Sequence, residues 1–471
     1  MAFEPERIDV QAVLRHVPHF ETFCSVAKLC DAVENLRRGP ADCTVEVAGH
    51  SVNGQPIHHV CFGRGRAVKA LVVGFPHCHE PIGSLTVYSL MRLLQEQQSD
   101  LTRADVEWHI VPCIDPDGAV LNEGWTQKPF SFEAYLKHRH VQTWLDQVDC
   151  SFPITYKKLA FAQPSREAEV LRSLLEQIRP DFFFSLHNSI AAGGAWYPIS
   201  RDLGSECYQQ LRELRELYCI PLQQSIAHQK WCAQFGEGIY EMFTVRKLYD
   251  DLEQRVSAPE SFVKMGAASW DYLATIREDA VVFAAELPHA KYAASMNLSE
   301  DSGENLRQFR LRLEAENKFL ITVIAQEWEG VKDQLDCDNP FYKKTVQEII
   351  PVIAKLSEGV PLSLGANSTQ DILFNPAYAR TMTLAERSDI YLGDRFNVLC
   401  HTYEFVRLLQ LSSQTSAIRR ARQRLEGVFA RALAEMPRIL GSDAFSTIDC
   451  DTLCKVQLGS GLIALNSVLR H

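Results

Sequence analysis

Three side chains that commonly bind metals stand where apolar segments of the sequence end. His77 and Glu80 lie three residues apart in GFPHCHEPIG, so a chain leaving a strand for a helix can turn both toward one point. His187 follows the apolar run DFFFSL and offers a third donor. Two histidines and one glutamate leave the fourth position of a tetrahedral zinc ion open for water, as in catalytic rather than structural sites. The sequence therefore predicts one zinc ion that activates water.

Glu286 is the residue best placed to serve as the general base that such chemistry needs. The attacking water must lose a proton, and a carboxylate near the metal can accept it. Glu286 ends the apolar run AVVFAAEL, where partial burial would raise its pKa toward the range useful for proton transfer. A lone His-x-x-Glu is a weak signal. Four such residues at three strand ends are a much stronger one and favour an active site.

Apolar runs without polar alternation must position these residues. KALVVGF, VEWHIVPCI, DFFFSLHN and AVVFAAELP have the pattern of strands that are covered on both faces. Helical segments alternate with them, namely IGSLTVYSLMRLLQEQ and SREAEVLRSLLEQI, the second with Ser165 available as N-cap. Strands that alternate with helices predict an α/β fold, a mixed central sheet flanked by helices. Such sheets usually place ligands at strand ends.

The two ends of the sequence predict elements outside this core. In the first 65 residues, a helix in FETFCSVAKLCDAVENLRR precedes two short strands joined by the turn signal Asn53-Gly54. NLRQFRLRLEAENKFLITVIAQEWEGV has the pattern of one long amphipathic helix that closes the sheet domain. Residues 359–368 have a loop composition, and the segments after them are rich in helix formers. We predict a catalytic domain over residues 1–335 and a helical C-terminal domain over 338–471.

The composition excludes several classes of protein. The chain has 471 residues, 46% of them hydrophobic and 23% charged, and a net charge of −11 without a basic stripe for nucleic acid. No apolar stretch approaches the roughly 18 residues of a membrane span, and the N-terminus lacks a secretory pattern. We therefore expect a cytoplasmic protein with no membrane partner. The 14 cysteines are scattered as in reduced proteins, and Cys450 and Cys454 lack the second pair of a structural zinc site.

With these motifs in this order, the sequence resembles the zinc carboxypeptidase family, peptidase family M14, over roughly residues 20–330. PHCHE matches its zinc motif, and SLHN supplies the third ligand. VPCIDPDGA resembles its Asn-Pro-Asp-Gly segment, with Asp115 in place of Asn. GAASWDYLATIREDAVVFAAELPH resembles the stretch that carries the specificity loop and the catalytic glutamate, which maps to Glu286. The resemblance implies that zinc-bound water attacks an amide carbonyl with Glu286 as general base.

The sequence departs from the family in its expected substrate contacts. In place of the Asn-Arg pair that binds a terminal carboxylate, VDCSFP gives Asp149 and Cys150. His79 replaces the usual arginine, and the mobile tyrosine falls nearest Val263. If Asp149 faces the cleft, its charge should repel a free C-terminal carboxylate. The expected substrate is then a small amidated or amine-bearing peptide, or an N-acyl or isopeptide-linked metabolite, and the enzyme an atypical peptidase or amidase.

Other residues are hypotheses for the substrate side. Arg139 or Lys128, in TQKPFSFEAYLKHRH, would restore a carboxylate clamp, although a solvated helix charge is the plain alternative. Trp270 falls at the family's pocket floor, where an indole would admit only a small or flat side chain. Tyr272 and Tyr240 are potential phenolic donors to the oxyanion, although tyrosine is commonly a half-buried core residue.

Two rival functions remain open on the sequence. His77-x-His79 is also the paired metal motif of an amidohydrolase barrel, a metal deacylase, although such a barrel needs eight regular βα units and a late Asp ligand. Otherwise His79 lines the cleft. The second rival is a carboxypeptidase-like binding protein without activity. The retention of Glu286 beside three metal ligands argues against it.

Overall fold

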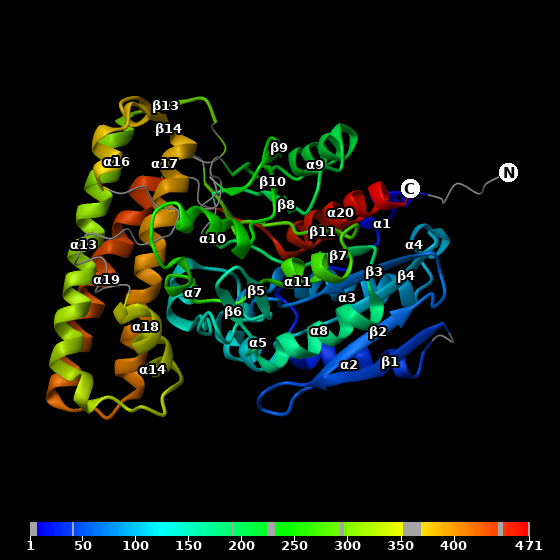
Figure 1. The fold of residues 1–471 in the computed structure, drawn as a ribbon, viewed down its shortest axis with the longest axis horizontal. Coiled ribbons are helices and arrows are strands. Elements are labelled where there is room, and N and C mark those ends of the chain that lie inside the picture. The colour runs from blue at the N-terminus through cyan, green and yellow to red at the C-terminus, as the bar shows by residue number, and fades with distance from the viewer. Residues whose placement is uncertain are drawn as a thin grey trace.

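The computed structural model describes residues 7–39, 42–190, 193–223, 231–292, 296, 298–351, 369–440 and 446–469. Within these residues the four apolar runs form neighbouring parallel strands at the centre of a sheet (Figure 1). They are β3 (Val68–Val73), β4 (Val106–Val111), β7 (Phe182–Ser185) and β11 (Val281–Phe283). Nearly all of their residues are buried, as expected for strands covered on both faces.

Shorter strands extend this sheet on both sides, so that it has nine strands among the described residues in the order β1-β2-β4-β3-β7-β11-β8-β10-β9. The predicted hairpin pairs β1 (Cys43–His50) with β2 (Pro56–Phe62), and Gly54 adopts a φ of 82° in its turn. The far side consists of β8 (Tyr197–Ile199), β9 (Gln234–Gly236) and β10 (Ile239–Glu241). Parallel and antiparallel pairs both occur, so the predicted mixed sheet is confirmed.

Helices cover both faces of the sheet. One face packs against α8 (Arg166–Ile178), α10 (Val245–Glu253) and α11 (Ser269–Ile276). The other packs against α2 (Val26–Arg37), α3 (Ile82–Gln95) and α20 (Cys450–Val468). The predicted cap of α8 is confirmed, because Ser165 accepts a hydrogen bond from the Ala168 amide. Smaller elements of this part are α1 (Val10–Leu14), α4 (Ser99–Arg103), α5 (Pro116–Leu121), α6 (Glu123–Thr126), α7 (Phe132–His138), α9 (Ser205–Leu217), β5 (Ile154–Tyr156) and β6 (Leu159–Phe161).

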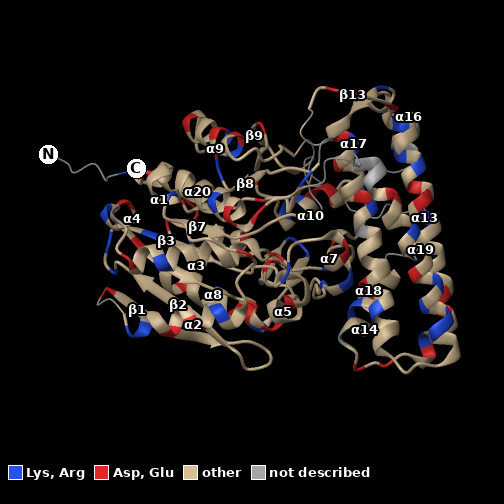
Figure 2. Ribbon diagram, turned by 180° about the vertical axis from the view of Figure 1, so that it is seen from behind, with Lys and Arg blue, Asp and Glu red and all other residues tan. Residues whose placement is uncertain are grey.

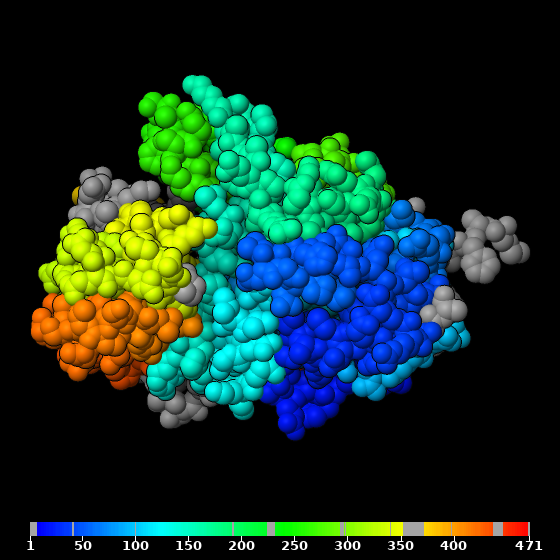
Figure 3. Space-filling view, turned by 90° about the horizontal axis from the view of Figure 1, so that it is seen from below, coloured from blue at the N-terminus to red at the C-terminus, as the bar shows by residue number. Residues whose placement is uncertain are grey.

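A bundle of helices lies at one end of the sheet (Figure 1). It contains α13 (Leu306–Val331), α14 (Pro340–Lys344), α16 (Thr369–Phe374), α17 (Leu384–Tyr391), α18 (Asn397–Leu411) and α19 (Ser416–Leu440). Figure 3 shows these yellow and orange segments beside the cyan segment of the sheet domain. Two short ladders join distant parts of the chain, β13 (Asp301–Asn305) with β14 (Thr381–Thr383) and β12 (Ala290–Lys291) with β15 (Ser446–Thr447).

The packing divides the chain differently from the predicted boundary near residue 335. The long helix α13 packs against α18 and α19 and so belongs to the bundle, whereas the last helix, α20, returns to α3, α9 and α1 in the sheet domain. Helix α20 is buried nearly all round, which explains its central place. At Gly461, a Cβ atom would lie 2.2 Å from the Phe184 ring of β7, so the close approach of α20 requires glycine. The predicted loop at 359–368 lies outside the described residues.

In the described part of the chain, neither a basic stripe that could bind nucleic acid nor a membrane-spanning helix is found. Figure 2 shows acidic and basic residues interspersed over both parts of the molecule. Within the described ranges, each helix is too short or too polar to cross a membrane. All 14 cysteines are free thiols, as the scattered spacing predicts.

Candidate metal centre

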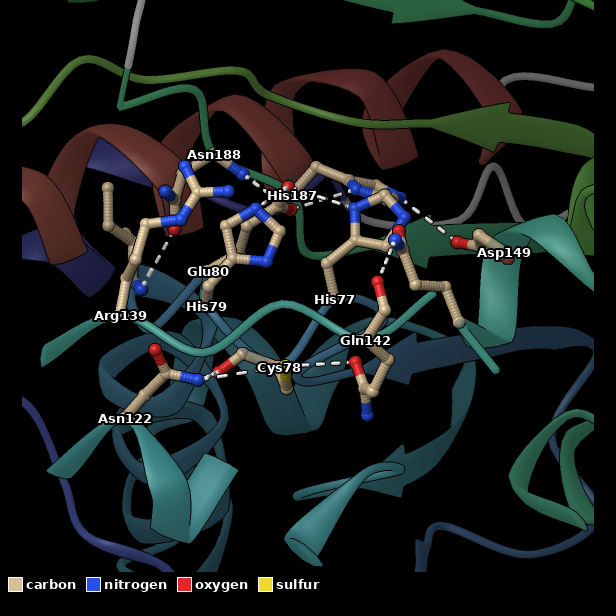
Figure 4. Close-up of polar contacts among 12 residues, drawn as sticks. His77, Cys78, His79, Glu80, Asn122, Arg139, Gln142, Asp149, His187 and Asn188 are labelled. Carbon is tan, nitrogen blue, oxygen red and sulfur yellow. Dashed lines mark hydrogen bonds and ion pairs between the residues drawn. The ribbon is translucent and has the colours of Figure 1, made fainter. Parts of the chain in front are cut away.

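The structure brings the three predicted metal ligands together. His77 and Glu80 lie in the turn from β3 to α3, and His187 follows β7, the neighbour of β3 in the sheet. One donor atom from each residue lies within 4.8 Å of the others (Figure 4). His77 Nδ1 is 2.9 Å from Glu80 Oε1, and His187 Nδ1 is 3.0 Å from Glu80 Oε2. The ends of two adjacent parallel strands thus create a three-donor cluster.

The donor set fits a zinc ion. Zinc bonds of about 2.0–2.1 Å place neighbouring donors of a tetrahedron about 3.3 Å apart, close to the separations found. Both nitrogens of His187 face carboxylates, since Nε2 lies 3.1 Å from Asp149 Oδ2. Burial acts to lower its pKa, but Glu80 and Asp149 together raise the pKa of His187 well above its usual range. Positive charge is therefore stabilised between His187 Nδ1 and Glu80. A divalent cation can take the place of the proton there.

Asp149 lies behind His187 and not in a substrate cleft. Only 2% of its surface is exposed. Its Oδ2 accepts from His187 and, at 3.3 Å, from the Ser185 hydroxyl, while its Oδ1 accepts from the Ser269 amide at 3.0 Å. The expectation that Asp149 repels a substrate carboxylate is therefore wrong. A carboxylate on the outer nitrogen of a metal-binding imidazole fixes the tautomer and orientation of the ring, and we assign that role to Asp149.

Asp149→Asn is accordingly expected to weaken zinc binding by about 10- to 100-fold, because the amide can accept the His187 proton but carries no charge. Competition with a chromophoric chelator measures the affinity. Asp279→Asn is the matched control, since Asp279 is exposed and contacts Arg277 on the surface. An unchanged zinc affinity in folded Asp149→Asn protein would remove the positioning role.

The fourth residue predicted for the site is Glu286. It lies three residues after β11, and its backbone pairs with Trp196. Burial, followed by the charge of Glu80, raises the pKa of Glu286 to about 7, while His187 and His77 act in the opposite direction. The carboxyl group is therefore within electrostatic reach of all three ligands. A carboxyl with a raised pKa can accept a proton and release it again near neutral pH.

Of the aromatic residues predicted for the substrate side, only Trp270 contacts a ligand. Its ring meets His187 edge-on at 5.9 Å between centroids, and its Nε1 donates to the Phe243 carbonyl at 2.7 Å. The Tyr272 hydroxyl donates instead to Glu176 of α8, away from the centre, so the prediction of an oxyanion donor there is wrong. Tyr240 is buried on β10 and packs against Trp196.

Arg139 and His79 form a second layer next to the ligands. The His79 ring stacks on His77 at 5.9 Å, and Figure 4 shows Arg139 beside it. Arg139 is buried and pairs at 3.0 Å with Glu404 of α18. Lys128 is exposed, outside this buried group. The bundle therefore reaches the site through Glu404.

Further residues of the site come from distant segments that the sequence did not mark. Lys344, at the end of α14, lies 3.6 Å from Glu404 and donates to the Val141 carbonyl at 2.9 Å. Gln457 of α20 donates to the His187 carbonyl at 2.7 Å. The Asn188 amide donates to Glu80 at 3.1 Å. Of these residues, only Asn188 adjoins a predicted ligand and could have been found from the motif.

Comparison with known proteins agrees with this geometry. The family model for zinc carboxypeptidases matches residues 29–293, more than half of the chain. The chain belongs to the zinc carboxypeptidase family, M14. The open, mixed sheet of this M14 protein also contradicts the amidohydrolase alternative, because β1 and β9 are free edges of the described sheet and several strand pairs are antiparallel.

Several solved structures resemble this M14 protein at low sequence identity. A metallo-carboxypeptidase from Burkholderia cenocepacia is 14% identical, with a TM-score of 0.36, and the match covers 56% of this chain and 60% of that one, less than two thirds of its length. Carboxypeptidase A from Helicoverpa armigera is 14% identical, with a TM-score of 0.36, and the match covers 59% of this chain and 69% of that one. A Pseudomonas aeruginosa metallo-carboxypeptidase in complex with (2-guanidinoethylmercapto)succinic acid is 16% identical, with a TM-score of 0.35. The match covers 56% of this chain and 60% of that one. Among curated proteins, no sequence matches significantly.

Proposed function

We propose that this M14 protein is an atypical metallopeptidase or amidase that hydrolyses an amide bond. The observation that carries the proposal is the convergence of His77, Glu80 and His187 at adjacent strand ends, with Glu286 within electrostatic range of them. A zinc ion held by the three ligands would act as a Lewis acid on the amide carbonyl and on the attacking water.

The chain's own residues would perform the proton transfers and hold the site rigid. Glu286 accepts the proton of the attacking water and passes it to the leaving nitrogen. Asp149 and Ser185 orient His187, and the Asn188 amide holds Glu80. These contacts keep the ligands in place between turnovers.

The charges next to His79 support a substrate with an anionic group. Arg139 and Lys344 share the single carboxylate of Glu404, and all three residues are at least nine-tenths buried. Among the described residues, Glu404 is the one carboxylate within ion-pair distance of these two cations, and a buried cation without an anion is costly. Burial lowers the pKa of His79 well below its usual range, and the charges of Arg139 and Lys344 act in the same direction. We therefore favour a relocated carboxylate clamp over the amine-bearing substrate expected from the sequence.

Lys344→Met tests this clamp. With paired peptides that differ only in a free or amidated C-terminus, kcat/KM for the free acid should fall by about tenfold or more, because one charge-assisted hydrogen bond is lost. Cleavage of the amidated peptide should change little. The control is Lys343→Met, since Lys343 is exposed and pairs with Asp146 at 2.6 Å. Equal losses for both peptides would contradict the clamp.

The reaction class itself is tested with zinc-loaded protein and a panel of dipeptides and N-acyl amino acids. We expect release of a free amine that stops when the zinc is chelated. A zinc-loaded protein that binds members of the panel and cleaves none would favour the rival function, a binding protein that has lost activity.

A further inference from the structure

A second cluster of metal-ligand side chains lies in the sheet where β2 ends and β4 begins, whereas His77, Glu80 and His187 follow the ends of β3 and β7. Cys61 of β2 is the direct partner of His109 on β4, and Glu107 precedes His109 by two residues. Directly paired residues, and residues two apart on a strand, project from the same face. One donor atom from each of the three residues lies within 4.8 Å of the others. The exposed fractions of Cys61, His109 and Glu107 are 2%, 6% and 7%, so the cluster is buried.

A line of hydrogen bonds leads from the hairpin to this cluster. Glu46 Oε1 lies 2.8 Å from His59 Nδ1, His59 Nε2 lies 2.9 Å from His109 Nδ1, and His109 Nε2 lies 2.9 Å from Glu107 Oε1. The two imidazole rings are stacked, with 5.1 Å between their centroids. Three side-chain contacts in a row thus connect two carboxylates through two histidines.

Two neutral imidazoles carry only two N–H groups for these three contacts. A carboxylate can only accept, so one of the three contacts has no hydrogen: either His109 Nε2 faces Glu107 with a lone pair, or His59 Nδ1 faces the exposed Glu46 with one. In the first arrangement, a cation between His109 Nε2 and the Glu107 carboxylate would remove the repulsion.

Among the described residues, His109 is the one basic side chain within ion-pair distance of Glu107. In the described part of the chain, no lysine or arginine lies within ion-pair distance of it. The Gly65 amide, a neutral donor, donates to its Oε2. Lys69, its direct partner on β3, donates instead to the Ile178 carbonyl at 3.3 Å. A buried carboxylate usually pairs with a cation or coordinates a metal.

We propose that Cys61, Glu107 and His109 bind a second divalent transition-metal ion of the zinc class. A thiolate and a carboxylate neutralise a dication, and a mixed sulfur, nitrogen and oxygen donor set suits zinc or cobalt. His59 and Glu46 orient His109 as an outer imidazole and carboxylate do at other metal sites. The ion ties the β1–β2 hairpin to the parallel core, because its ligands come from both sides of the β2–β4 junction.

Cobalt distinguishes the two sites, because only this one contains sulfur. A Co²⁺ ion bound by a thiolate shows a sulfur-to-metal charge-transfer absorption, and His77, Glu80 and His187 cannot produce it. The purified chain loaded with Co²⁺ should show this band and bind two ions. Cys61→Ser should lose the band and one ion, whereas His187→Ala should lose one ion and keep the band.

Cys43→Ser is the matched control. Cys43 is paired with Phe62, so it projects from the opposite face of the hairpin, and this variant should keep the band. His109→Gln provides a second test if Cys61→Ser folds poorly, and it should also lose the band. A fully folded, cobalt-loaded wild-type protein without the band, or a band that persists in Cys61→Ser, would overturn the proposal and leave a hydrogen-bonded chain only. Neither outcome bears on amide hydrolysis.

Discussion

Replacing His187 or His77 by alanine is expected to release the zinc ion bound with Glu80 and to abolish turnover. Each substitution removes one of three protein ligands, and losing even an outer partner of a metal ligand costs about 10- to 100-fold in affinity. The loss of a direct ligand should exceed that range. Elemental analysis after dialysis should show one zinc ion fewer per chain than in the wild type.

The control for these variants is His50→Ala, because His50 is an exposed histidine of β1 far along the sheet from β7. Its zinc content and activity should match the wild type. Circular dichroism separates metal loss from unfolding. Zinc content that stays at the wild-type level in both His77→Ala and His187→Ala would contradict the assigned ligands.

Glu286→Gln is expected to keep the fold and the metal and to lower kcat by about 100- to 10,000-fold, the usual contribution of a general base. The neutral amide has nearly the same shape but cannot accept a proton from the attacking water. Burial raises the pKa of this carboxyl to about 7 before any cation is bound, and a nearby dication favours the ionised form. The wild-type rate should therefore rise with pH up to an apparent pKa below about 7, because the base works only when ionised.

Metal analysis of Glu286→Gln provides the internal check. Wild-type zinc content with residual turnover near the uncatalysed rate fits the proposed base. If the variant loses zinc or unfolds, the role of Glu286 is structural. If kcat is unchanged, Glu286 takes no part in proton transfer.

The central strands and the ligand cluster could be predicted from the sequence because both depend on local pattern. Apolar runs without alternation identify buried parallel strands, and His77, Glu80 and His187 follow directly after two of them. The ends of adjacent parallel strands meet at one edge of the sheet. Local sequence therefore sufficed to bring these residues together.

The surroundings of the cluster could not be predicted because they depend on contacts between distant segments. Glu404 reaches Arg139 across 265 positions of the chain, and Gln457 reaches the His187 carbonyl across 270. The inward direction of Asp149 depends on Ser185 and Ser269, which no motif connects to it. The prediction that Asp149 faces the cleft was made from its charge alone and was therefore wrong. The same limit applies to α20, whose return to the sheet depends on the close approach of Gly461 to Phe184.

An anomalous difference map at the zinc absorption edge, from crystals of the zinc-loaded protein, tests the central claim most directly. The proposed function predicts a peak within bonding distance of His77 Nδ1, His187 Nδ1 and the Glu80 carboxylate, whatever is found beside Cys61. A zinc-loaded crystal with no peak among these three residues would contradict it.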